Sequence, residues 1–216
     1  KRYRMQSKII LLTTAILIFV PAIFFFVCDF GQVSIGKRTL LSLFQSVTTR
    51  TAGFNTADLS SMTEVGQAIM ILLMGGSPSS TAGGMKTTTV AVLLLNAFAT
   101  FRSREDAGAF GRRFDSQVIK NAATIAMLYF VLFFFGGITI SVYEGLSLQL
   151  CLYEAASAVG TVGLTLGITP GLHILSRLIL IVLMYLGRVG GLTLIYAVVS
   201  RRNTNAKMPL EKITVG

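Results

Sequence analysis

The sequence predicts an all-α integral membrane protein built from two parallel repeats of helix, re-entrant loop and helix. Three observations support this fold class. Of the 216 residues, 53% are hydrophobic and only 13% are charged, and the mean hydropathy is +0.71, a profile typical of membrane proteins. The basic residues cluster beside long apolar segments, and a short Thr-x-Gly segment recurs 110 positions later, at Gly53 and Gly163.

The charge distribution predicts the topology. Thirteen of the nineteen basic residues lie in three clusters, at Lys1–Lys8, Arg102–Lys120 and Arg201–Lys212. Five of the nine acidic residues lie in the opposite set of loops: Asp29, Asp58, Glu64, Glu144 and Glu154. Because positive residues are retained on the cytoplasmic side, we expect a multi-pass protein of the cell membrane with both ends of this segment in the cytoplasm. The net charge of +10 then reflects topology, so lipid and not nucleic acid is the expected surrounding partner.

The first repeat begins with an apolar segment long enough to cross a bilayer. Ile9–Val27 contains 19 residues without a charge, close to the ~20 that a spanning helix requires. An outer loop follows at Asp29–Arg38. Thr39–Thr48 is too short to span and is predicted to be a re-entrant half-helix, with Arg50–Thr56 as its returning loop and Ala57–Glu64 leading back to the surface.

The second helix of this repeat is predicted to be broken in the middle of the membrane. Val65–Met74 is apolar, G-G-S-P-S-S-T-A-G-G follows at Gly75–Gly84, and the apolar pattern resumes at Thr87–Phe101. Four glycines and a proline in this segment oppose a regular helix, and unwound backbone at this depth must be buried in protein or line a water-filled cavity. The alternative is a helix-packing surface of small residues, which Pro78 and Lys86 disfavour.

The second repeat has the same order of elements. Asn121–Val142 is a second span, Gln149–Ser157 a second half-helix, and Ala158–Thr165 a second loop. Leu166–Leu172 returns to the surface, and His173–Ser200 is a last span of 28 residues, long enough to cross with a tilt. Both units run in the same direction, so the predicted repeats are parallel.

The two loops have the composition of a cation filter. A half-helix that enters from outside points its partially negative end at the membrane centre, and glycine allows backbone angles that turn carbonyl oxygens toward an axis. Carbonyl rings of this kind replace an ion's hydration shell in potassium channels. One Thr-x-Gly triplet would be a chance match, but two at equivalent positions are specific. The predicted filter residues are Thr51, Ala52, Gly53, Phe54, Thr161, Val162, Gly163 and Leu164.

Four segments in order resemble the potassium-translocating subunits of the Trk/Ktr/HKT superfamily, closest to the Ktr type. T-R-T-A-G-F-N at Thr49–Asn55 resembles the family's third filter segment, and G-T-V-G-L-T at Gly160–Thr165 resembles its fourth. G-G-S-P-S-S-T-A-G-G-M-K resembles the intramembrane gating loop of the third repeat, and L-G-R-V-G at Leu186–Gly190 resembles the arginine-bearing segment of the last helix. The resemblance therefore identifies this chain with the C-terminal half of such a subunit.

The resemblance implies potassium uptake through a pseudo-four-fold cation channel-like fold, with K⁺ as transported ion, Na⁺ as a further candidate, and no covalently bound cofactor, metal site or enzymatic activity. The third-type repeat would occupy residues 1–107 and the fourth-type repeat residues 108–216. Because four loops complete such a filter, the other half must come from the same subunit, which we expect to precede Lys1, or from a second copy. The resemblance further implies a homodimer of full subunits and a cytosolic nucleotide-binding ring of the RCK type. Arg102–Lys120 and Arg201–Gly216 are the surfaces available for docking that ring.

The expected gate is the intramembrane loop together with one arginine. We predict that Arg188 hydrogen-bonds carbonyl groups of the loop and hinders cations, although purely structural hydrogen bonds remain an alternative. Arg50 would repel cations beside Thr51, so it is expected to point away and to pair with Glu154 or Glu64. The predicted gate residues are Gly75, Gly76, Ser77, Pro78, Ser79, Ser80, Thr81, Ala82, Gly83, Gly84 and Arg188.

Two other functions are compatible with parts of this sequence. An ion-coupled secondary transporter also uses broken helices with a midplane site, but commonly through inverted repeats. An intramembrane hydrolase would use a serine of the glycine-rich segment as nucleophile. It would lack a base, because His173, the one histidine, is predicted near the outer face.

Overall fold

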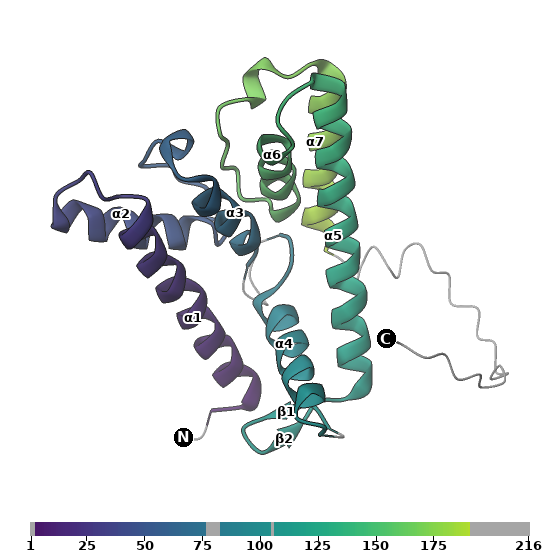
Figure 1. The fold of residues 1–216 in the computed structure, drawn as a ribbon. Coiled ribbons are helices and arrows are strands. Elements are labelled where there is room, and N and C mark those ends of the chain that lie inside the picture. The colour runs from purple at the N-terminus through teal and green to yellow at the C-terminus, as the bar shows by residue number, and fades with distance from the viewer. Residues whose placement is uncertain (1–2, 77–82, 105, 191–216) are drawn as a thin grey trace, which may run out of the picture.

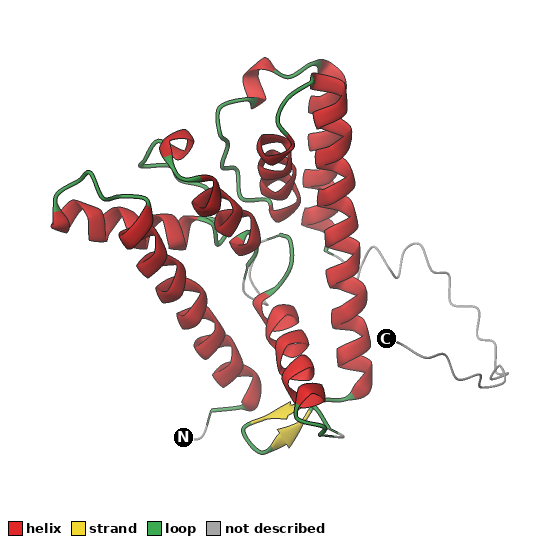
Figure 2. Ribbon diagram, in the orientation of Figure 1, coloured by secondary structure: helices red, strands yellow, loops and turns green. Residues whose placement is uncertain are grey.

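The computed structural model describes residues 3–76, 83–104 and 106–190. These residues are mostly helical (Figure 2). Within these described ranges, two helices are long and apolar enough to cross a membrane: α1 (Met5–Cys28) and α5 (Ser116–Glu144). Figure 1 shows the short helices α2 and α6 at the same end of the molecule, while the start of α1 and the start of α5 lie together at the opposite end.

Helix α1 and the half-helix α2 (Ile35–Thr48) are joined by side chains that bond main-chain carbonyls. The Arg38 guanidinium donates to the carbonyls of Phe26 and Val27 at the end of α1 and lies 4.4 Å from the Phe26 ring centre. The Ser46 hydroxyl donates to the Ile18 carbonyl at 2.6 Å. The half-helix predicted from Thr39 begins four residues earlier, at Ile35. Arg38 therefore lies inside the helix, where its guanidinium bonds carbonyls that the end of α1 leaves free.

The predicted break between two shorter helices is confirmed. A 3₁₀ turn η1 (Leu59–Ser61) leads into α3 (Glu64–Leu73), and α4 (Thr87–Phe101) follows the break. Gly75 and Gly84 form an isolated antiparallel bridge, and the Thr87 N–H donates to the Gly76 carbonyl at 2.9 Å. The two stems of the break therefore lie side by side. The predicted gate residues Ser77, Pro78, Ser79, Ser80, Thr81 and Ala82 lie outside the described residues.

The loop before α3 is held by two carboxylates. Asp29, which follows α1, accepts hydrogen bonds at 2.8 Å from both the N–H and the hydroxyl of Thr63. The Thr63 hydroxyl in turn caps α3 by accepting from the Gly66 N–H. Asp58 accepts from the hydroxyl and the N–H of Ser60, and these bonds lower the pKa of the Asp58 carboxyl.

The connection between α4 and α5 contains a small hairpin that the all-α prediction missed. Strand β1 (Gly108–Ala109) pairs antiparallel with β2 (Arg112–Arg113). Phe110 and Gly111 both have positive φ, at 53° and 75°, as a type I′ turn requires. The strands are too short for alternating polarity to reveal them. Lys8 lies 5.3 Å from the Phe110 ring centre, so the hairpin also contacts the start of α1.

The second unit consists of α5, the half-helix α6 (Leu148–Gly160), a 3₁₀ turn η2 (Thr169–Gly171) and α7 (Ile174–Val189). Helix α6 extends to Gly160, so residues 158–160, which the sequence predicts to be loop, form its last turn. Helix α7 ends at Val189, and Gly190 has a φ of +88°, which stops a right-handed helix. The predicted continuous span to Ser200 is therefore wrong at Gly190, and its remainder lies outside the described residues.

Helix α6 lies at the centre of the packing. Nine of its residues are buried, and Tyr153, fully buried, bonds the Met70 sulfur of α3 through its hydroxyl at 3.8 Å. The opposite holds for the long helices, whose most apolar windows are only 22% and 17% buried in this chain. A buried short helix surrounded by longer helices with exposed apolar faces is expected when the outer surface meets lipid.

Candidate functional site

The loop after α6 combines left-handed backbone with a buried carboxylate. Thr161 ends the helix at a φ of +52°, and Gly163 has a φ of +90°. The Val162 N–H donates to the Ser157 carbonyl at 2.9 Å, which turns the chain away from the helix axis. Left-handed backbone is uncommon for threonine, so other contacts must hold this residue in place.

Glu154 holds the returning part of this loop against α6. One carboxylate oxygen accepts from the Thr165 hydroxyl at 2.6 Å and from the Leu166 N–H at 2.9 Å. The other accepts from the Thr169 hydroxyl at 2.7 Å. The side chain is only 4% exposed, and a buried carboxylate needs such donors. Sequence reasoning missed this role; the one available signal is a lone acid in an otherwise uncharged half-helix.

The loop after α2 has the same local backbone. Thr51 and Gly53 have φ values of 67° and 75°, matching Thr161 and Gly163 in the sign of φ. The N–H groups of Ala52 and Gly53 donate to the Thr48 carbonyl, and the Thr48 hydroxyl donates to the Phe54 carbonyl at 2.6 Å. The correspondence that the sequence predicts thus extends to the backbone angles.

The structure brings the two predicted filter loops together. A Cβ atom placed on Gly53 would collide with the Val162 carbonyl oxygen, so this approach requires glycine. The side chains differ in environment: Val162 and Leu164 are buried, whereas Phe54 is 72% exposed. All eight predicted filter residues lie on these two adjacent loops.

The stem of the break that precedes α4, Gly83 and Gly84, contacts the loop after α6 and the last helix, α7. The Gly83 N–H donates to the Thr161 hydroxyl oxygen at 2.9 Å, and the Gly84 N–H donates to the Gly187 carbonyl at 3.2 Å. Arg188 follows Gly187 in the last turn of α7 and is exposed on this chain. The structure thus places the predicted gate stem and the predicted gate arginine on neighbouring segments.

Comparison with known proteins identifies the family of this chain. The family model for the cation transport protein TrkH matches residues 5–206. The chain belongs to the TrkH family. The family model describes cation transport proteins of the membrane, and the exposed apolar faces of α1 and α5 are those expected of a chain that lies in a membrane.

Relatives within the TrkH family match the whole chain. The potassium/sodium uptake protein NtpJ of Enterococcus hirae is 35% identical over all of this chain and 51% of its own length. The Ktr system potassium uptake protein B of Bacillus subtilis is 31% identical over all of this chain and 50% of its own length. The chain therefore spans about half the length of these relatives.

A solved structure has the same fold. The potassium transporter TrkH from Vibrio parahaemolyticus superposes with a TM-score of 0.71 over 90% of this chain and 44% of its own. The two sequences are 20% identical in this comparison, so the likeness concerns the fold. The resemblance to Trk and Ktr proteins inferred from four short motifs is confirmed.

The predicted ion pair of Arg50 is wrong. Both oxygens of Glu154 accept hydrogen bonds from its own loop, and the ion pair found among the described residues is Arg113 with Asp106, at 3.6 Å. The Arg50 Nε and Nη2 atoms are buried without a hydrogen-bond acceptor in the described part of the chain. The prediction from charge alone is wrong because hydroxyl and N–H groups of the loop already donate to the Glu154 carboxylate. Nor does Glu64 form an ion pair with Arg50 within the described residues.

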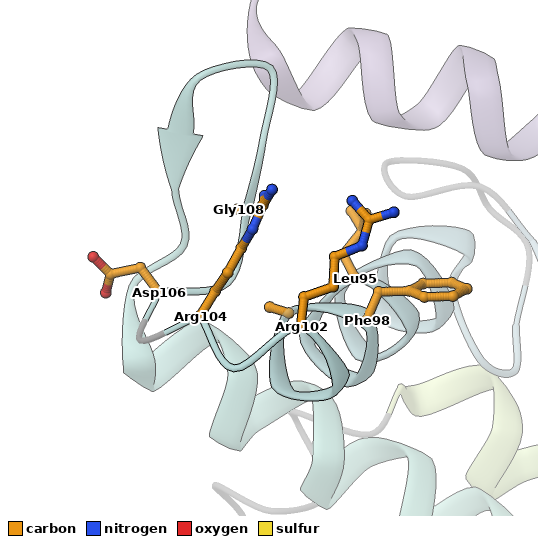
Figure 3. A pocket seen from close by; sticks show the side chains of 7 residues that line it. Leu95, Phe98, Arg102, Arg104, Asp106 and Gly108 are labelled. Carbon is orange, nitrogen blue, oxygen red and sulfur yellow. The ribbon is translucent and has the colours of Figure 1, made fainter.

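The basic connection between α4 and α5 has a hollow on its surface. A cavity of about 230 Å³ lies where α4 meets the hairpin, with Phe98 on one side and Arg102 and Arg104 at its edge. Figure 3 shows both arginine side chains beside the hollow, with the Asp106 carboxylate pointing away from them. Since Asp106 pairs with Arg113, this edge of the predicted docking surface is positively charged.

Proposed function

We propose that this chain is the pore-lining half of a Ktr/Trk-type potassium uptake protein, with the two loops after α2 and α6 forming half of a carbonyl selectivity filter. The observation that carries the proposal is the meeting of two loops with matching backbone angles, where Gly53 approaches the Val162 carbonyl. Relatives that match the whole chain are named as uptake proteins for potassium, or for potassium and sodium. K⁺ is the proposed transported ion, with Na⁺ as a second candidate.

The proposed filter needs two further loops. In a pseudo-four-fold arrangement of helix–pore-loop–helix repeats, residues 1–107 and 108–216 each supply one loop, and the other half of the same subunit supplies the rest. The chain covers 51% and 50% of the two relatives, which is the share that two of four repeats would occupy. Both termini of this segment would be cytoplasmic, on the side of the basic hairpin.

The proposed gate is the intramembrane break together with Arg188. The bonds of Gly83 and Gly84 to the second loop and to α7 hold the far stem of the break next to the proposed filter. A guanidinium on the neighbouring turn would raise the energy of a cation there, because charge repulsion is strong where water is scarce. In this account two full subunits associate side by side. A cytosolic nucleotide-binding ring docks on the basic connection around Arg102 and Arg104.

Flux measurements on the full-length parent protein in liposomes test the proposal. A channel-like uptake protein passes K⁺ down its gradient without an added driving ion, and prefers K⁺ to Na⁺. An ion-coupled secondary transporter instead accumulates its substrate only when a second ion gradient is imposed. Strict dependence of K⁺ movement on an imposed Na⁺ or proton gradient would favour that alternative.

A further inference from the structure

One hydrogen bond crosses from the intramembrane break to the second loop. The Gly83 N–H donates to the side-chain oxygen of Thr161 at 2.9 Å, although the two residues are 78 positions apart. Thr161 is the first residue of the loop and stands in left-handed backbone. Because this conformation is strained for a β-branched residue, a partner fixed on another segment helps to hold it.

The contact is part of a tight junction between three segments. A Cβ atom on Gly83 would collide with the Thr161 hydroxyl and would lie 2.6 Å from the Thr161 methyl group. A Cβ atom on Gly84 would lie 2.8 Å from the Gly160 Cα atom, and one on Gly187 would collide with the Val159 carbonyl. The break, the end of α6 and the last turn of α7 therefore approach one another closely at these glycines, so that movement of one segment acts directly on the others.

The first loop lacks this link. Thr51 has the same left-handed backbone as Thr161, with φ values of 67° and 52°. Within the described residues, the Thr51 hydroxyl makes no hydrogen bond to another segment. The link is thus a property of the second loop and not of the Thr-x-Gly motif as such.

We propose that Thr161 is a positioning residue for ion selectivity: its bond to Gly83 ties the geometry of the second filter loop to the stem of the intramembrane break. This inference rests on the proposed function, because it assumes that the loop selects ions. The hydroxyl holds Thr161 at the φ value that sets the direction of the following carbonyls, and the break supplies the N–H. A shift of the Gly83 stem therefore also shifts the second filter loop.

The test is a set of variants in the full-length parent protein, with the K⁺/Na⁺ permeability ratio in liposomes as the readout. Thr161→Val keeps the shape and removes the acceptor, so the ratio should fall about threefold to tenfold, in line with the loss of one partly buried hydrogen bond. Thr161→Ser keeps the hydroxyl and should restore most of the ratio. If Thr161 acted only through the packing of its methyl group, serine, which lacks that methyl group, would not restore the ratio. Thr51→Val removes a hydroxyl without a cross-segment bond, so its ratio should fall less than that of Thr161→Val.

A second pair of variants keeps the proposal testable if Thr161→Val folds poorly. Gly83→Ala should lower the ratio by displacing Thr161, and Thr161→Ala should remove the collision as well as the bond. The double variant should then be no less selective than Thr161→Ala alone, a non-additivity that marks direct contact. Additive losses, or a Thr161→Val protein with the parental ratio, would overturn the inference. A parent protein that does not conduct K⁺ would instead refute the proposed function.

Discussion

The carboxylate of Glu154 should contribute more to the stability of the second loop than any other single side chain at this site. It is 4% exposed and accepts three hydrogen bonds from the loop, from Thr165, Leu166 and Thr169. Hydrogen bonds to a charged group contribute about 1.5–3 kcal/mol each, but three bonds to one carboxylate are not additive. We therefore expect Glu154→Ala to destabilise the protein by roughly 3–5 kcal/mol.

Glu154→Gln separates hydrogen bonding from charge. The glutamine carbonyl oxygen can accept from Thr165 and Leu166, while its NH₂ group faces the Thr169 hydroxyl, which can turn to accept. Three bonds of ordinary strength then replace three charge-assisted bonds, so the loss should be about 1–2 kcal/mol. Asp106→Asn is the matched control, because the Asp106 side chain is 64% exposed in its ion pair and such pairs contribute little.

The assay is thermal unfolding of the purified full-length protein in detergent, followed by the K⁺/Na⁺ permeability ratio of the folded fraction. The expected order of melting temperatures is parent and Asp106→Asn together, then Glu154→Gln, then Glu154→Ala. The ratio should fall in the same order, because a loop that loses its anchor cannot hold its carbonyls in place. A Glu154→Ala protein that melts with the parent would refute the anchoring role.

Three further predictions concern other contacts of this region. Gly53→Ala places a methyl group against the Val162 carbonyl, so the K⁺ flux per folded protein in liposomes should fall at least tenfold. An unchanged flux would show that the two loops do not meet in this way. Arg188→Gln should raise the K⁺ flux in the same assay by removing a positive charge beside the gate stem, and a normally folded variant with equal or lower flux would contradict this. Asp29→Ala removes both bonds to Thr63 and should lower the free energy of unfolding by about 1–3 kcal/mol, as measured by thermal unfolding. The K⁺/Na⁺ permeability ratio should change little. A parental melting temperature would contradict a stabilising role of Asp29.

Much of the helical framework follows from the sequence, because long uncharged segments and glycine-rich breaks have few alternatives in a membrane. The break after Met74 was predictable, since Gly75 and Gly76 at one end and Gly83 and Gly84 at the other cannot continue a helix cheaply. Helix ends were less predictable. Arg38 suggested a loop, yet its guanidinium bonds the end of α1 and the residue lies inside α2.

The polar contacts of the site could not be read from the sequence. Glu154 lies 11 residues before Thr165 and 15 before Thr169. Because α6 ends at Gly160, these contacts depend on the path of the loop and not on a helical repeat. The predicted pairing of Arg50 with Glu154 is wrong because opposite charges in a sequence do not show which hydrogen-bond donors lie nearest to a carboxylate. The bond from Gly83 to Thr161 joins segments that are 78 positions apart, and only the packed structure brings them together.

The central claim, that the loop after α6 selects potassium, is tested most directly by comparing two glycine substitutions in the full-length parent protein. Gly163 and Gly167 have φ values of 90° and 93°, and a Cβ atom on either would meet nothing within 4 Å. Gly163→Ser and Gly167→Ser therefore impose the same backbone strain, but only Gly163 lies in the proposed filter. Loss of the K⁺ preference with retained flux in Gly163→Ser, and a parental preference in Gly167→Ser, is the predicted result. An unchanged preference in Gly163→Ser, or an equal loss in both variants, would contradict the filter assignment.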